Sequence, residues 1–210
     1  MSNPRFPSLP WDQVVDRVAP SVFCVNAGDS SGTGFVVSVG RGATEDRSYT
    51  MVATAWHVIK DLSSTSQCLE LVSYDGKRTV SNATDRIGFL RLGPSVFDTA
   101  LIYLDTAKPL IESGDLLPVF PANSMLARGA DIGWLGFPSI ADPEFCFFRG
   151  VISGYLGSPP TYLVDGVAIN GVSGGPVFDD RCHLIGMVSA YLPNQLDENT
   201  LLPGLAAIRQ

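Results

Sequence analysis

The chain consists largely of short runs rich in β-branched and aromatic residues, and turn-forming residues separate these runs. Such runs predict strands, and many short strands at regular spacing indicate a β-sandwich or a β-barrel. The Asp75-Gly76 pair between two of the runs favours a hairpin turn. We expect strands at residues 22–25, 35–39, 49–54, 69–73, 77–80, 100–104, 132–135, 145–148, 151–155, 162–164, 176–178, 184–189 and 205–208.

One segment before the first expected strand has a helical pattern. Pro10 and Asp12 favour a helix start, and Pro20 ends the helix after about two turns. The Pro-containing stretch 106–119 separates the strand-like runs into two groups, so we expect the fold to have two halves, residues 1–108 and 109–210. We also expect a polar loop at 192–203.

Composition and charge limit the partners of the chain. Its 210 residues are 45% hydrophobic and 17% charged, which is typical of a globular protein with a core. No apolar run approaches the roughly twenty residues of a membrane helix, and the first residues lack the pattern of a signal peptide, so we expect a cytoplasmic protein without a membrane partner. The net charge is −7, so we expect no nucleic-acid partner.

The acidic excess lies in the second half of the chain. Residues 1–108 hold 11 Asp and Glu against 10 Lys and Arg, a net of −1, whereas residues 109–210 hold 10 against 4, a net of −6. We interpret this excess as a solvated surface rather than a cleft for basic substrates. The four cysteines lack the paired spacing of a zinc site, so we expect reduced, mostly buried thiols and no metal: Cys24, Cys68, Cys146 and Cys182.

The sequence Gly-Val-Ser-Gly-Gly-Pro at 171–176 is the most specific motif of the chain. A match to Gly-x-Ser-Gly-Gly-Pro arises by chance in roughly one chain per thousand of this length. Upstream of it, His57 lies in an apolar, strand-like run at 49–59, and Asp98 precedes the expected strand at 100–104. A serine, a base and an acid are therefore present in the order His57, Asp98, Ser173.

These residue types suit hydrolysis by a serine nucleophile. The Ser173 hydroxyl needs a neutral imidazole to accept its proton, and His57 is the candidate base. Asp98 would hold the imidazole in the correct tautomer. We place Asp98 ahead of Asp105, which ends the same expected strand and is expected to point to solvent. We expect the second histidine, His183, at the surface, because it follows the polar turn Asp179-Asp180-Arg181.

The motifs resemble those of the chymotrypsin-like serine peptidases, and most closely the HtrA-type branch. The similarity covers nearly the whole chain, from about Asp12 to Ile208, and leaves no room for a PDZ domain. The resemblance implies an all-β fold of two six-stranded antiparallel β-barrels with a short N-terminal helix. It also implies a serine endopeptidase with a polypeptide substrate and no cofactor. Beyond the three candidate residues, the resemblance rests on segments 14–22, 31–37, 133–138, 149–154, 185–191 and 204–208.

The resemblance assigns further site residues. The backbone amides of Gly171 and Ser173 would form the oxyanion hole. Val167 and Ala168 would line an apolar pocket for the side chain before the cut. The run Ser189-Ala190-Tyr191 would pair with the substrate backbone, with the Ser189 hydroxyl near Asp98, although Tyr191 suits a rim residue of the barrel nearly as well.

Two alternatives need comparison. The motif also satisfies Gly-x-Ser-x-Gly of the α/β-hydrolases, but there the acid and the histidine follow the serine, and long helical patterns are missing here. A protease fold retained as a catalytically silent binding or scaffold module remains the alternative, because Val172 stands where the HtrA-type branch has a polar residue.

Val172 also bears on regulation. In digestive relatives an aspartate at this position pairs with an amino terminus freed by cleavage. Val172 offers no charge to such a terminus, and burying an unpaired amino group would cost several kcal/mol. We therefore expect no cleaved pro-segment, and switching by a partner protein, substrate or oligomer that acts on the loops at 170–173 and 140–147.

Overall fold

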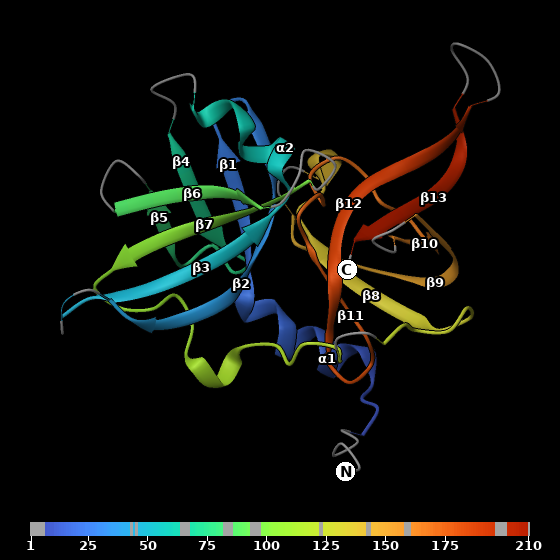
Figure 1. Ribbon diagram of the computed structural model, residues 1–210, viewed down its shortest axis with the longest axis horizontal. Helices are drawn as coiled ribbons and strands as arrows, with labels where there is room; N and C mark the ends of the chain where they lie inside the picture. Colours follow the sequence, from blue (N-terminus) through green and yellow to red (C-terminus); the bar gives the residue numbers. More distant parts are fainter. Residues whose placement is uncertain are drawn as a thin grey trace.

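The computed structural model describes residues 7–42, 44, 46–63, 68–81, 86–92, 98–121, 124–141, 144–157, 161–195 and 201–209. Of residues 63, 86, 141, 190–195, 201–205 and 209 it describes only the backbone. Two β-sheets lie side by side, the first built by the blue-to-green part of the chain and the second by the yellow-to-red part (Figure 1). The last strand of the first sheet along the chain, β7, ends at Thr106, and the first strand of the second, β8, begins at Asp131.

The expected N-terminal helix is present as α1, Trp11–Val18. Asp12 lies in its first turn and Arg17 in its last, which suits the helix dipole at each end. Val14 and Val18, four residues apart, share a face and are fully buried. The helix therefore docks on the domain core, and a 3-10 turn that contains Pro20, η1 (Ala19–Ser21), leads from it into the first strand.

The first half forms a seven-stranded sheet in the order β5-β4-β1-β2-β3-β7-β6. All of its strand pairs are antiparallel, and along β4 buried residues alternate with less buried ones, as expected when one face of a sheet covers a core. Its strands are β1 (Val22–Ala27), β2 (Ser30–Arg41), β3 (Ser48–Thr54), β4 (Leu69–Ser73), β5 (Thr79–Ser81), β6 (Arg86–Leu92) and β7 (Thr99–Thr106).

The first sheet differs in detail from the six-stranded barrel that the resemblance implies. It has seven strands, and within the described residues β5 and β6 are its two unpaired edges, so it is a half-barrel. β5 is only three residues long, which limits the hydrogen bonds that it can offer a further strand. Two short helical segments, α2 (Trp56–Ile59) and η2 (Lys60–Ser63), connect β3 to β4.

The second half forms the expected closed barrel of six strands, in the order β10-β13-β12-β11-β8-β9. Its first strand follows a linking segment that contains η3 (Ser113–Asp115), and η4 (Ser139–Ala141) follows that strand. The barrel strands are β8 (Asp131–Gly136), β9 (Cys146–Leu156), β10 (Thr161–Asp165), β11 (Pro176–Phe178), β12 (Leu184–Gln195) and β13 (Leu201–Arg209).

A hydrophobic core joins the two halves. One cluster of buried side chains includes Val14 of α1, strands of the first sheet, and Leu135 and Phe178 of the second barrel. A second cluster fills the closed barrel around Trp134 and Tyr162, which are both fully buried. Each fully buried large apolar side chain stabilises the fold by about 1.5–3 kcal/mol relative to exposure. The halves therefore have a shared apolar contact that fixes their relative position.

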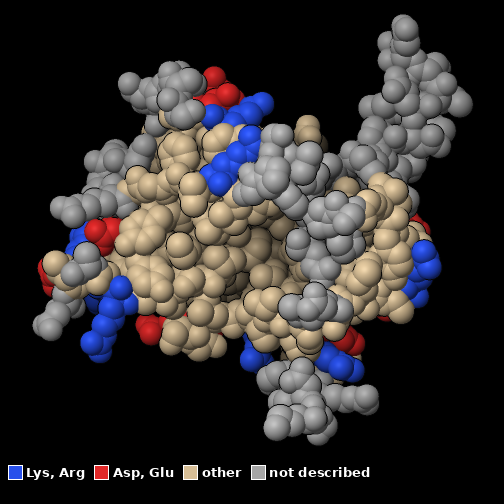
Figure 2. Space-filling model, viewed as in Figure 1, with Lys and Arg blue, Asp and Glu red and all other residues tan. Residues whose placement is uncertain are grey.

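Charged residues lie mainly toward the margin of the face seen in Figure 2, and uncharged atoms border the hollow near its centre. Among the described residues, no helix combines the length and the apolar character that crossing a membrane requires.

Candidate active site

His57 lies on the four-residue helix α2, immediately after β3. This position corrects the expectation that it belongs to a strand-like run, because the chain turns at Ala55, whose carbonyl accepts the Val58 N–H at 3.1 Å. The Trp56 N–H donates to the Asp98 carbonyl at 3.2 Å. The helix that carries His57 is thus fixed to the segment that carries Asp98.

Asp98 directly precedes β7 and contacts His57 at two points. Its Oδ1 accepts the His57 backbone N–H at 2.9 Å, and its Oδ2 lies 2.6 Å from the ring Nδ1. Because an ionised carboxylate can only accept hydrogen bonds, the neutral ring carries its proton on Nδ1 and leaves Nε2 as an acceptor. The two side chains remain 45% and 24% exposed, so a substrate can approach the ring.

Asp105, the rival acid, lies at the other end of β7. Its Oδ1 is 2.8 Å from Nε of Arg47, and its side chain is largely buried. The expectation that Asp105 points to solvent is therefore wrong, because the guanidinium of Arg47 draws the carboxylate onto the sheet. The structure gives Asp105 a pairing role at the far end of the strand.

Ser173 lies in the tight loop between β10 and β11, and several backbone hydrogen bonds hold the loop. The Val172 N–H donates to Ile169 O at 3.2 Å, and the Gly175 N–H donates to Val172 O at 3.0 Å. The Gly174 N–H donates to Val188 O on β12 at 2.8 Å. The first two bonds brace the loop internally, and the third anchors it to β12 directly after the serine.

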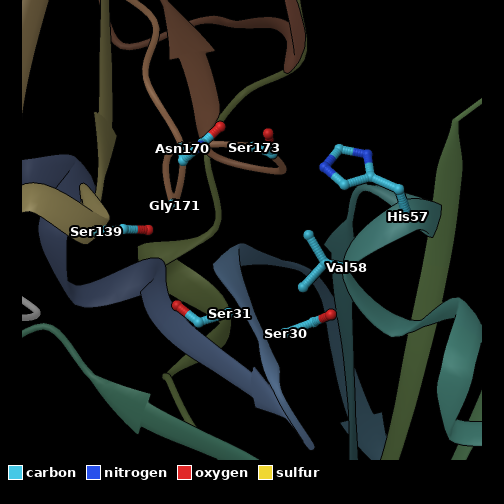
Figure 3. Close-up of a pocket in the computed structure, with 8 residues that line it drawn as sticks. All are labelled: Ser30, Ser31, His57, Val58, Ser139, Asn170, Gly171 and Ser173. Atoms are coloured by element: carbon cyan, nitrogen blue, oxygen red, sulfur yellow. The ribbon is translucent and has the colours of Figure 1, made fainter.

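Ser173 and His57 line one pocket with a volume of about 160 Å³. In Figure 3 the His57 ring extends from α2 toward the loop that carries Ser173, Asn170 and Gly171. The walls also include residues to which the sequence analysis assigns no individual role, namely Ser30, Ser31, Val58, Ser139 and Asn170. They come from β2, α2, η4 and the loop that carries Ser173, and the fold brings them together at the site.

Gly171 adopts a left-handed conformation with φ of +93°. A side chain at this position would lie 2.1 Å from the Phe137 carbonyl oxygen, so only glycine fits. The carbonyl before it, Asn170 O, accepts the Ser139 N–H at 2.8 Å. Since the C=O and N–H of a trans peptide point in opposite directions, the Gly171 N–H points away from Ser139.

The same geometry applies at Ser173. The carbonyl of the same peptide, Val172 O, accepts a hydrogen bond from the Gly175 N–H. Among the described residues, neither the Gly171 nor the Ser173 amide donates to a protein acceptor. Both donors are therefore available to an oxygen atom of a ligand.

The residues expected to bind substrate have different surroundings. Val167 is 57% exposed, whereas Ala168 is 3% exposed and packs in the core of the second barrel. Ser189 is buried in β12, and for Ala190 and Tyr191 on the same strand only the backbone is described. Of the three whose side chains the structure describes, Val167, Ala168 and Ser189, none lines the pocket that holds Ser173.

His183 does not lie free at the surface as expected. Its Nδ1 is 2.9 Å from Oδ2 of Asp179, and its ring makes an edge contact with Phe120. Asp179 Oδ1 also accepts the backbone N–H groups of Arg181 and His183, each at 2.9 Å. The histidine therefore stabilises the turn between β11 and β12.

The four cysteines are free thiols, and they divide into two groups. Cys24 and Cys182 are buried, while Cys68 is exposed and Cys146 is intermediate. Burial raises the pKa of the Cys24 thiol to about 11, with a further contribution from the Glu70 carboxylate. Among the described side chains, no group of His, Cys, Asp or Glu could hold a metal ion.

Comparison with known proteins agrees with this arrangement. Residues 32–187 match the family of the trypsin-like peptidase domain. The chain therefore belongs to the trypsin-like peptidase family. A search of curated protein sequences finds no match.

Two solved structures share the fold. The serine endoprotease from Yersinia pestis aligns with 95% of this chain at 19% identity and a TM-score of 0.66. This chain spans 61% of that protein's chain. The inactive form of Rv3671c protease aligns with 96% of this chain, and with 89% of its own, at 22% identity and a TM-score of 0.63. The mainly β, trypsin-like fold predicted from the sequence is thus confirmed.

Proposed function

We propose that this protein is a serine endopeptidase in which Ser173, His57 and Asp98 hydrolyse peptide bonds. The observation that carries the proposal is the shared pocket. The pocket holds a serine from the loop between β10 and β11 and a histidine from α2, and Oδ2 of Asp98 lies 2.6 Å from Nδ1 of that histidine.

The chemistry follows from the tautomer of His57. Its Nε2 accepts the Ser173 proton while the hydroxyl oxygen bonds to the substrate carbonyl carbon. The C–N bond then breaks, and the same proton passes from Nε2 to the leaving amine. A water molecule releases the acyl group by the reverse sequence of proton transfers. Asp98 stabilises the imidazolium that forms in each half of the cycle.

The amides of Gly171 and Ser173 would receive the oxyanion of the tetrahedral intermediate. The carbonyl groups of the same two peptides, Asn170 O and Val172 O, accept hydrogen bonds within the protein. Neither N–H group donates to a protein acceptor among the described residues. Such a preorganised donor is worth about 3 kcal/mol in the transition state. The loop is therefore suited to catalysis without a rearrangement of its backbone.

Substrate recognition and regulation extend this proposal. Val167 and Ala168 would favour a small or medium aliphatic residue before the cut, and β12 at Ser189-Ala190-Tyr191 would pair with the substrate backbone. A partner protein or an oligomer would change the rate through the loops at 170–173 and 140–147, of which residues 142–143 lie outside the described residues.

Reaction with a fluorophosphonate tests the proposal, because only an activated serine reacts. The wild type should be labelled once, at Ser173. Ser173→Ala and His57→Ala should each abolish labelling, and His57→Ala should lower turnover on the order of a millionfold.

Two matched variants control for loss of a serine or a histidine elsewhere. Ser153→Ala removes an exposed hydroxyl, and His183→Gln removes the other histidine. Both should retain labelling. A wild type that is folded but not labelled would favour the silent binding module, and labelling that persists in Ser173→Ala would refute the assignment of the nucleophile.

A further inference from the structure

Thr33 of β2 is fully buried beside the candidate nucleophile loop, and all of its polar groups are engaged. It lies far from Ser173 in the sequence, and no sequence motif assigns it a chemical role. Its neighbours come from β3, from the end of β8 and from the loop between β10 and β11. Thr33 is thus a meeting point of the two sheets.

The Thr33 hydroxyl makes two hydrogen bonds. It donates to the Gly171 carbonyl oxygen at 2.7 Å and accepts the Phe137 N–H at 3.1 Å. A hydroxyl can do both at once, whereas a methyl group can do neither. The space is also limited, because Gly136 approaches the hydroxyl so closely that a side chain there would lie 2.8 Å from Thr33 Oγ1.

The Thr33 backbone extends this connection. Its N–H donates to Ser173 O at 2.9 Å, and its carbonyl accepts the Thr54 hydroxyl at 2.7 Å. Thr54 ends β3, three residues before His57. One residue therefore contacts the serine loop on both sides and, through Thr54, the strand that leads to the histidine.

We propose that the Thr33 hydroxyl is a positioning group that fixes the oxyanion loop, an inference that rests on the proposed peptidase function. Two consecutive peptide planes meet at Gly171. Ser139 N–H holds the Asn170 carbonyl, and Thr33 Oγ1 holds the Gly171 carbonyl. Because each peptide is planar, holding both carbonyls sets the φ and ψ of Gly171 and so the direction of its N–H.

Removal of the hydroxyl therefore has a defined effect. In Thr33→Val the side chain keeps nearly the same shape, but Gly171 O and Phe137 N lose a buried partner. The Gly171 peptide can then rotate. Thr33 does not line the pocket, so substrate affinity should change little. We expect kcat to fall about ten- to hundredfold, as for loss of a buried hydrogen bond, with KM within about twofold.

Thr33→Ser and Thr50→Val are the matched comparisons. Serine retains the hydroxyl and should keep kcat within about threefold of the wild type. Thr50 is also a fully buried threonine of the first sheet, and its Oγ1 accepts the Leu110 N–H at 3.1 Å. Thr50→Val therefore removes a buried hydroxyl far from the oxyanion loop and should leave kcat unchanged.

A second measurement does not depend on catalysis. In hydrogen exchange followed by mass spectrometry, a peptide that spans 170–175 should exchange about tenfold faster in Thr33→Val than in the wild type. The same peptide should be unaffected in Thr50→Val. This readout separates the positioning role of Thr33 from the proposed peptidase function, because exchange can be measured even if the wild type lacks peptidase activity.

The inference would be overturned by either of two results. One is a Thr33→Val protein that is folded, exchanges at 170–175 like the wild type and retains full kcat. The other is an equal loss in Thr33→Ser and Thr33→Val, since a serine keeps both hydrogen bonds. If Thr33→Val does not fold, Thr33→Ser decides the question alone. Wild-type kcat and exchange in Thr33→Ser would support the inference. Changes in kcat and exchange of the size expected for Thr33→Val would contradict it.

Discussion

Asp98 holds His57 by its backbone and its ring at once, at 2.9 Å from the amide nitrogen and 2.6 Å from Nδ1. The bond to the amide fixes the start of α2, and the contact with the ring sets its rotation and tautomer. The carboxylate therefore sets both the position and the tautomer of the proposed base.

Asp98→Asn should leave the protein folded and lower kcat by about 10⁴-fold, because an amide can stabilise the wrong tautomer of the ring. Asp105→Asn is the matched control on the same strand, and it should change kcat less than about twofold. Steady-state hydrolysis of a peptide substrate measures both. Similar losses in the two variants would mean that the effect is structural.

If the proposed function holds, Gly171→Ala should lower the rate about a hundredfold or more, because its side chain would lie 2.1 Å from Phe137 O and the proposed oxyanion donor would be displaced. Gly76 has a similar φ of +69° but open space around it. Gly76→Ala should therefore cost only about 1 kcal/mol of unfolding free energy from backbone strain and leave the rate intact. Labelling rates and urea unfolding distinguish the two outcomes.

Val172→Asp should destabilise the fold. Val172 is 1% exposed in the core of the second barrel, and a carboxylate buried there without a partner costs several kcal/mol. We expect a fall in Tm of about 10 °C, against a smaller fall for Val172→Ala, which only leaves a cavity. A Tm for Val172→Asp at or above that of Val172→Ala would show that a charge is tolerated at this site.

Removal of residues 1–7 should change the peptidase rate less than threefold, because Val172 offers no charge to a new amino terminus. The deletion retains Ser8 and Leu9, which bond to Asp180 on the turn between β11 and β12. A tenfold rise in rate after such trimming, with the new terminus buried beside Ser173, would contradict this expectation.

The cysteines should react with an alkylating reagent in a fixed order. Burial raises the Cys24 pKa from 9.0 to about 11, so the neutral thiol is favoured and the reactive thiolate is about a hundredfold scarcer below pH 9. Cys68 is exposed and should be modified first in the native protein at pH 8. Peptide mapping measures the order, and guanidinium should abolish the difference.

The fold class could be predicted because short β-branched runs specify strands wherever they occur. Pro10 and Asp12 predicted the start of the helix now seen at Trp11–Val18. The number of short strands indicated a sandwich or a barrel, and the resemblance implied the barrel. β9 was divided in two because Gly150 resembles a turn residue. At position 150 glycine is needed for a steric reason, because a side chain there would lie 2.6 Å from Asp165 O.

Two other elements have sequence patterns that are too weak to predict them. β6 was missed because Gly88 interrupts its apolar run, and α2 is too short to show a helical period. Of the expected polar loop at 192–203, residues 192–195 and 201–203 lie in β12 and β13, because pairing between the two strands outweighs local composition, and residues 196–200 lie outside the described residues.

The order His57, Asp98, Ser173 identified the candidate site, because each residue lies in a recognisable segment. The contacts of Thr33 could not be foreseen. They join residues 33, 137 and 171, and only the packing of the two sheets brings these positions together. Side-chain hydrogen bonds of this kind depend on three-dimensional distances that no local pattern encodes.

The closing strand β13 pairs with both β10 and β12, and β12 in turn holds the Ser173 loop through Val188. During synthesis the ribosome makes His57, Asp98 and Ser173 before it makes this last strand. A chain that lacks β13 thus contains all three candidate residues but has an open barrel. The support that β12 gives the Ser173 loop therefore depends on a strand that is made after the residues it serves.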